Sequence, residues 1–416
     1  MPNKSPRRET SASLDATLLF SAAREIVSAE GLVGLTLRPL AARLDVSVST
    51  LTNRFGSRDE IIASITGAAR ADDAAHLARW SQRIATLPAL SSSIAADVAE
   101  AILDDMAGVG RQTSVLFLEL LQACAWDQPL RGAFAAWLAE RTAFWANLAR
   151  RAHVPQPAID AGLVQGYMVD ELVHTLALGD WPAYRILRKL GLNRLFSGFA
   201  RPTPPNGDAE LFNTVFRELE YQPAALSVVH GAPITADWRG AVAKAAAHLI
   251  TTRGAGAVTH RAVATESQVK TTTLAYRFPT QEDLVVGGLE YIIARLLRRM
   301  DEDESQVIRR ANSESDPGID IGRATFAVAL HTPHMERLKP CSADMRRCRG
   351  INLIKFLKRQ SPNQSGLDDL SAQAMSVALV GLGMTLNPDS DRIEDRMRQG
   401  LKCAIDWARQ AELAQA

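Results

Sequence analysis

One short stretch of this sequence, SVSTLTNRF at residues 47–55, gathers side chains suited to contact a polar, charged partner. If Ser47 opens a helix here, Val48, Leu51 and Phe55 pack inward and a small polar face points outward. That face carries Ser49, Thr50, Thr52, Asn53 and Arg54. Hydroxyl, amide and guanidinium groups can hydrogen-bond base edges or phosphates, and small side chains let a helix approach a groove closely. The stretch therefore predicts a helix that reads nucleic acid.

The residues before this stretch predict the elements that position it. An amphipathic pattern over residues 14–30 indicates a first helix, which Gly31 can end. Thr36 is placed to cap a short second helix at 37–44, and Asp45 follows in a tight turn. A short helix, a tight turn and a further short helix form a helix-turn-helix, which fits a DNA major groove.

The charge that would attract DNA is local. The net charge of the 416-residue chain is only +1, so no global excess of cations indicates a nucleic-acid partner. Between residues 38 and 58, however, four arginines face one carboxylate, Asp45. These arginines are Arg38, Arg43, Arg54 and Arg58.

The same pattern occurs twice. Residues 16–62, the first reader, align without a gap with residues 239–285, the second reader. The match includes positions that helical periodicity does not require, among them Gly31/Gly254, Arg38/Arg261 and Phe55/Phe278. The second reader is less typical, because Gln281 replaces Arg58, and a module kept only for packing is the alternative. Its polar outer face favours a working reader and presents Arg261, Lys270, Thr271, Thr272, Thr273, Tyr276 and Arg277.

The string GLVGLTLRPLAARLDVSVSTLTNRFGSRDEI, residues 31–61, resembles the helix-turn-helix of the TetR repressor family. The resemblance implies that Arg38 and Arg58 contact the DNA backbone. It also implies that Val48, Ser49, Thr50 and Asn53 lie on the groove side of the recognition helix. Two residues depart from the family pattern: Thr52 replaces a common Tyr, and Asp45 replaces a turn Gly. The first departure weakens a backbone contact, whereas Asp tolerates the left-handed conformation that the second requires.

Good helix formers dominate the chain and strand-like alternation is scarce, so we predict an all-α fold built as a tandem repeat. The Pro- and Gly-rich stretch 200–208 marks a boundary, a helical piece follows at 210–221, and Thr235 or Asp237 can cap the next helix. The predicted domains are a first helix-turn-helix domain at 1–62, a first helical domain at 63–200, a linker with a short helix at 201–236, a second helix-turn-helix domain at 237–285 and a second helical domain at 286–416.

The family resemblance implies that each helical domain binds a small molecule and dimerises. Segments 161–179 and 371–386 have small and apolar faces near the ends of their domains, so they could pack together within one chain. The chain would then be an intramolecular pseudo-dimer with two unlike readers, although further homodimerisation stays open. An apolar effector pocket in the first domain would be lined by Phe117, Leu120, Cys124, Trp137, Phe144 and His174, and ordinary core packing of the aromatic residues is the alternative.

The remaining sequence features narrow the class of protein that the chain can be. Hydrophobic residues make up 47% and charged residues 22%, and no apolar run reaches the length of a transmembrane helix, which favours a cytoplasmic protein. No catalytic motif is present, and His331, His334, Cys341 and Cys348 match no common zinc spacing, so we expect no enzyme, cofactor or metal. We expect a ligand-responsive DNA-binding regulator with a double-stranded operator, a repressor released by an apolar effector. A small-molecule-binding or scaffolding protein with weak or lost DNA binding is the alternative.

Overall fold

The computed structural model describes residues 15–87, 90–220, 238–301, 321–360, 367–386 and 393–415. The regular structure in these ranges is entirely helical, as the sequence predicts. None of the helices described there is long and apolar enough to cross a membrane.

The first unit, residues 15–200, joins a reader to a helical body through one long helix. Helix α4 (Arg58–Ala85) packs against α1 and α3 of the reader and against α7 of the body. The elements of the reader are α1 (Ala16–Glu30), η1 (Leu32–Gly34), α2 (Leu37–Arg43) and α3 (Val48–Phe55). Those of the body are α4 (Arg58–Ala85), α5 (Ser92–Ala107), α6 (Arg111–Ala123), α7 (Gln128–Arg151), α8 (Gln156–Asp160), α9 (Leu163–Leu178) and α10 (Pro182–Phe196).

The second unit, residues 238–415, repeats this plan. Its reader contains α12 (Trp238–Arg253), η3 (Ala255–Ala257), α13 (His260–Ser267) and α14 (Thr271–Arg277). Its body contains α15 (Gln281–Asp301), α17 (Ile321–His331), η4 (Thr332–His334), η5 (Glu336–Leu338), α18 (Lys339–Arg347), α19 (Ile351–Gln360), α20 (Asp369–Thr385) and α21 (Ile393–Gln415). The predicted linker helix is α11 (Asp208–Glu218), which packs on α10. Thr235 and Asp237, the predicted caps of the following helix, lie outside the described residues.

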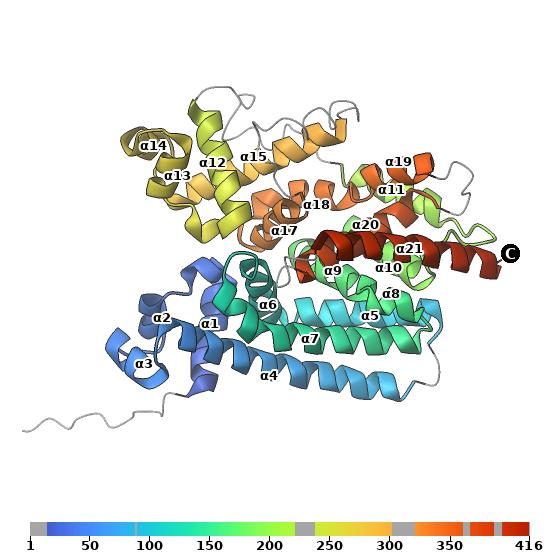
Figure 1. The fold of residues 1–416 in the computed structure, drawn as a ribbon, viewed down its shortest axis with the longest axis horizontal. Helices are drawn as coiled ribbons and strands as arrows, with labels where there is room; N and C mark the ends of the chain where they lie inside the picture. The colour runs from blue at the N-terminus through green and yellow to red at the C-terminus, as the bar shows by residue number, and fades with distance from the viewer. Residues whose placement is uncertain are drawn as a thin grey trace, which may run out of the picture.

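Both readers lie at the same end of the molecule. Figure 1 shows α1, α2 and α3 below α12, α13 and α14 at the left-hand end, with the two bodies extending to the right. The readers also touch, because η1 lies against η3. This arrangement allows both readers to face one partner.

The two units are held together by α9 and α20, which cross at two glycines. A Cβ added to Gly381 would overlap the carbonyl oxygen of Gly166, and one added to Gly166 would overlap that of Ala378. Only glycine permits this backbone approach, since any other residue would place a side chain in the crossing. The predicted pairing of segments 161–179 and 371–386 within one chain is therefore confirmed, and the chain is an intramolecular pseudo-dimer.

Buried ion pairs flank the crossing and join carboxylates of the first unit to arginines of the second unit. Arg346 donates to Glu171 at 2.7 Å, and both side chains are fully buried. Arg349 donates to Asp170 at 2.9 Å. Burial raises the pKa of Glu171, but the Arg346 guanidinium and a hydrogen bond from the Tyr184 hydroxyl together outweigh this effect, so the pKa of Glu171 lies below the usual range. Charged groups in a low dielectric require these partners, so the pairs fix which surfaces of the two units meet.

Candidate DNA interface

The recognition helix of the first reader, α3, begins in a cluster of hydroxyl groups. Ser47 caps the helix, because its Oγ accepts a hydrogen bond from the Thr50 backbone N–H at 3.0 Å. The same Oγ lies 2.8 Å from the Oγ of Ser49 and 2.8 Å from the Oγ1 of Thr50. Leu51 is fully buried beneath the helix. The polar N-terminal turn therefore faces solvent while one apolar residue anchors it.

The turn before α3 and the helix after it are held by local contacts. Asp45 has a φ of 54°, the left-handed conformation that the sequence predicts for it. Ser57 and Glu60 form a reciprocal capping box at the start of α4: the Ser57 backbone N–H donates to the Glu60 carboxylate at 2.7 Å. The box fixes Arg58, whose side chain is 59% exposed, at the first position of α4.

Thr36 occupies the N-cap position of α2, as predicted, although its side chain makes no capping hydrogen bond. Two other sequence predictions for the first reader need correction. Arg43 pairs with Glu25 of α1, so its charge is partly neutralised within the reader. Thr52 is half-buried and donates its hydroxyl to the Val48 carbonyl at 3.1 Å, so this hydroxyl is turned toward its own helix.

The second reader copies this geometry with different outward side chains. Gln268 has a φ of 57° at the position equivalent to Asp45. Thr280 and Asp283 repeat the reciprocal capping at the start of α15, with the Thr280 backbone N–H donating at 2.9 Å. His260 ties α13 to the end of α14 through a 2.6 Å contact with the Phe278 carbonyl oxygen. The second reader is therefore a fully formed helix-turn-helix, as its ungapped match to the first implies.

The outward face of α14 carries two side chains that would be unfavourable on a surface without a binding partner. Lys270 lies at the N-cap, where a cation is unfavourable because a helix N-terminus is already positive. Tyr276 is 92% exposed, although a large aromatic side chain gains free energy by burial. Thr271, Thr272 and Thr273 are also exposed. An anionic partner that covers this face would relieve both anomalies.

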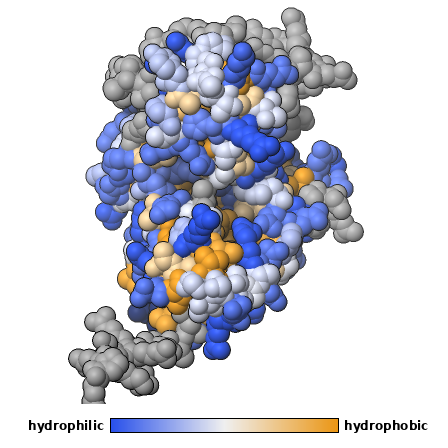
Figure 2. Space-filling model, turned by 90° about the vertical axis from the view of Figure 1, so that its left-hand side faces the viewer, coloured by the Kyte–Doolittle hydropathy of each residue, from blue (hydrophilic) through white to orange (hydrophobic). Residues whose placement is uncertain are grey.

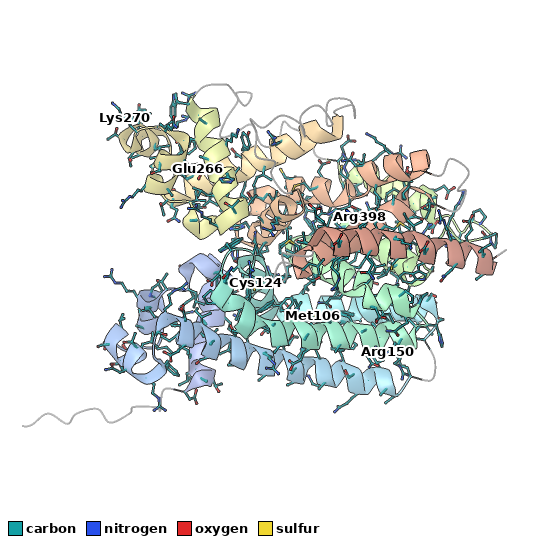
Figure 3. All side chains as sticks on the ribbon, in the orientation of Figure 1. Met106, Cys124, Arg150, Glu266, Lys270 and Arg398 are labelled. Carbon is teal, nitrogen blue, oxygen red and sulfur yellow. The ribbon has the colours of Figure 1, made fainter. Side chains whose placement is uncertain are left out.

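The predicted DNA-contacting residues are accessible in both readers. All are exposed except Val48 and Thr52, which are half-buried. The exposed residues are Arg38, Ser47, Ser49, Thr50, Asn53, Arg54, Arg58, Arg261, Lys270, Thr271, Thr272, Thr273, Tyr276 and Arg277. Figure 2 looks onto the end of the molecule that carries both readers and shows a mostly hydrophilic face. In Figure 3, Lys270 stands at the outer tip of the second reader.

The six residues predicted to line an effector pocket lie in the core of the first unit. Phe117, Phe134 and Trp137 form a cluster with ring centroids 5.1–5.8 Å apart. Arg141 lies 3.9 Å over the Phe117 ring and pairs with the buried Asp73 at 2.6 Å. The other predicted residues are equally enclosed: Leu120, Cys124, Phe144 and His174 are buried. An effector would have to displace these side chains, so the predicted pocket stays a prediction.

Two polar hollows offer more accessible sites. One, of about 260 Å³, lies between α1, α4 and the turn from α5 to α6, and its lining includes Arg24, His76, Met106 and Thr113. The other, of about 440 Å³, lies between the two units and is lined by residues such as Arg111, Asp180 and Lys339. Met106 appears in the first unit of Figure 3. Within the described ranges, no three His, Cys, Asp or Glu side chains converge as metal ligands.

The all-helical fold and its two exposed readers define a helix-turn-helix DNA-binding protein. The family model described as bacterial regulatory proteins, tetR family, matches residues 19–65 and again residues 242–286. The chain therefore carries two tetR-type DNA-binding regions in tandem, and these matches support the class of DNA-binding transcriptional regulators. The comparison with curated proteins found no match.

Proposed function

We propose that this chain is a ligand-responsive repressor in which one chain binds one operator through two unlike readers. The observation that carries the proposal is the position of α3 and α14 at the same end of a single chain. A homodimer presents two identical readers and so matches a palindrome, whereas this chain presents two different ones. The matching operator has two half-sites of different sequence.

The outward residues support a division of roles between the readers. In the first, the Ser49 and Thr50 hydroxyls and the Asn53 amide suit base edges, while Arg38 and Arg58 suit phosphates. In the second, Lys270 and Tyr276 replace the small polar groups of α3. Because these side chains differ in size and charge, the two half-sites should differ as well.

The proposed response to a ligand is a population shift. An effector that binds more tightly to an arrangement with misaligned readers lowers DNA affinity by its differential affinity for the two arrangements. The hollow between α1, α4 and the α5–α6 turn is a suitable binding site for the effector, because α1 is part of the first reader and α4 directly follows that reader. Its polar lining, which includes Arg24 and His76, suits polar groups on the effector.

The experiment that tests this function is selection of binding sites from random duplex DNA, followed by salt-dependent affinity measurement on the selected site. A sequence-specific regulator yields a defined site whose affinity falls steeply with salt. Recovery of no sequence, with weak and uniform binding to any duplex, would contradict the proposal. Transcription from a promoter that contains the site then separates a repressor from an activator.

A further inference from the structure

The turn that follows α6 in the first unit reaches the second reader. Trp126, three residues beyond the end of α6, lies against Gly254 at the junction of α12 and η3. A Cβ added to Gly254 would stand 2.7 Å from the Trp126 Cζ2 atom and 3.3 Å from its Cη2 atom. The indole ring thus rests on the backbone of the second reader.

The equivalent glycine of the first reader is also covered from α6. Gly31 and Gly254 have φ values of 71° and 78°, and each directly precedes the short turn that leads into its reader's helix-turn-helix. A Cβ at Gly31 would stand 3.1 Å from Oε1 of Glu119, which belongs to α6. One segment of the first unit, residues 119–126, therefore contacts the same structural point of both readers.

This segment is rigidly held. Arg131 of α7 donates from Nε to the Cys124 carbonyl at 2.7 Å and from Nη2 to the Ala125 carbonyl at 3.1 Å. Asp127 caps α7 through the Leu130 backbone N–H. Every residue of α6 from Thr113 to Ala123 is buried. In Figure 3, Cys124 marks the end of α6 where it approaches the second reader.

A rigid contact at this place fixes the separation and rotation of the readers. Adding one base pair between two half-sites moves them apart by about 3.4 Å and rotates one against the other by about a tenth of a turn. Two readers on a mobile connection would tolerate that change, whereas two readers held by the Trp126 contact and by the contact of η1 with η3 would not.

We propose that Trp126 is a specificity-determining residue that sets the half-site spacing the protein accepts. The inference rests on the proposed function, because it presupposes an operator with two half-sites. Trp126 contacts no DNA in this account: it is a positioning residue that acts through the second reader. The partner that it discriminates is a duplex with the two half-sites at one separation.

The test uses the full-length chain and a series of duplexes in which the two selected half-sites are separated by one base pair more or fewer at each step. For the unaltered protein we expect a single optimum, with a loss of about tenfold in affinity one base pair away, comparable to the cost of one mismatched base pair. For Trp126→Ala we expect that loss to shrink to about threefold or less, below the cost of one mismatched base pair. Preference for each half-site sequence should be unchanged, and Trp126→Phe should restore part of the spacing preference.

Two further variants keep the test decisive. Trp80→Ala removes an indole that bonds Asp105 in the first body at 2.7 Å, so it controls for a general loss of packing. Arg131→Ala releases the turn while leaving the indole intact, so it should also broaden the spacing preference. This variant provides the test if Trp126→Ala fails to fold. A spacing profile that stays as sharp in Trp126→Ala or Arg131→Ala as in the unaltered protein would overturn the inference. Absence of sequence-specific binding by the unaltered protein would instead overturn the proposed function.

Discussion

Gly166 of α9 and Gly381 of α20 lie backbone to backbone where the two units cross. We expect Gly381→Ala to destabilise the protein by about 3 kcal/mol, because the added methyl group overlaps the Gly166 carbonyl oxygen and neither backbone can move without loss of packing. Chemical unfolding measures the loss. Gly383→Ala is the matched control: its Cβ would meet Met397 Sδ at 3.6 Å, an ordinary contact, so this variant should be neutral or slightly stabilising. Equal stability of the two variants would contradict the crossing.

The buried pair of Glu171 and Arg346 provides a second test of the association between units. Glu171→Gln leaves the Arg346 charge buried without its counter-ion, which should cost about 3–5 kcal/mol of unfolding free energy. Asp395→Asn is the control, because Asp395 pairs with Arg398 on the surface, where an exposed pair contributes about 0–1 kcal/mol. If both variants unfold at the same denaturant concentration as the unaltered protein, the buried pair does not stabilise the interface.

Glu119 should make stability depend on pH. Burial raises the pKa of this carboxyl to about 7, although the Leu32 backbone N–H opposes the shift by donating a hydrogen bond to it. A pKa raised in the folded state means that the neutral form fits the fold, so the stabilisation is complete below the ordinary pKa of 4.5 and is lost as pH rises toward 7. Glu119→Gln mimics the neutral form. Its unfolding free energy relative to the unaltered protein should rise by up to about 3 kcal/mol between pH 5 and 8. A difference that stays constant over that range would show that Glu119 does not titrate there.

Positioning and reading residues in the DNA interface should respond differently to substitution. Arg58→Ala should weaken binding to every sequence and reduce the salt slope by about one, because it removes one phosphate contact. Arg398→Ala is the charge-matched control, since Arg398 lies on α21 of the second body and pairs there with Asp395. A sequence-dependent loss in Arg58→Ala would contradict the assignment of this residue to the DNA backbone.

Thr50→Ala and Lys270→Ala should each change preference at one half-site only. We expect discrimination to fall by about tenfold at positions under α3 for the first variant and under α14 for the second. Competition between the selected site and single-base variants measures this change. A uniform loss across all variants would mean that both residues position the protein rather than read it, and no loss for Lys270→Ala would mean that the second reader is structural.

Much of the fold was predictable because its determinants are local. The turn conformation at Asp45 and the glycines at positions 31 and 254 follow from which residues tolerate a positive φ. The match of Gly31 with Gly254 and of Phe55 with Phe278 at one offset identifies the repeat, and the small residues around Gly166 indicate a close helix crossing. These features need no knowledge of distant contacts.

The parts that the sequence did not predict depend on contacts between distant residues. Nothing in the periodicity of the chain indicates that Trp126 covers Gly254, or that Arg43 turns back to Glu25. The sequence predicts that Thr52 faces outward, but its hydroxyl donates to a carbonyl of its own helix. Both orientations are compatible with the same sequence pattern. The aromatic residues around Phe117 have the same spacing whether they enclose a ligand or one another, so only their ring contacts show how they pack.

In the proposed function one chain presents two unlike readers to one operator, and the native mass of the complex with a selected duplex tests this arrangement most directly. We expect a complex of one chain with one duplex, on a site whose two halves differ in sequence. Two chains on a palindromic duplex would contradict the claim, because pairing of the first readers of two chains would then provide the recognition.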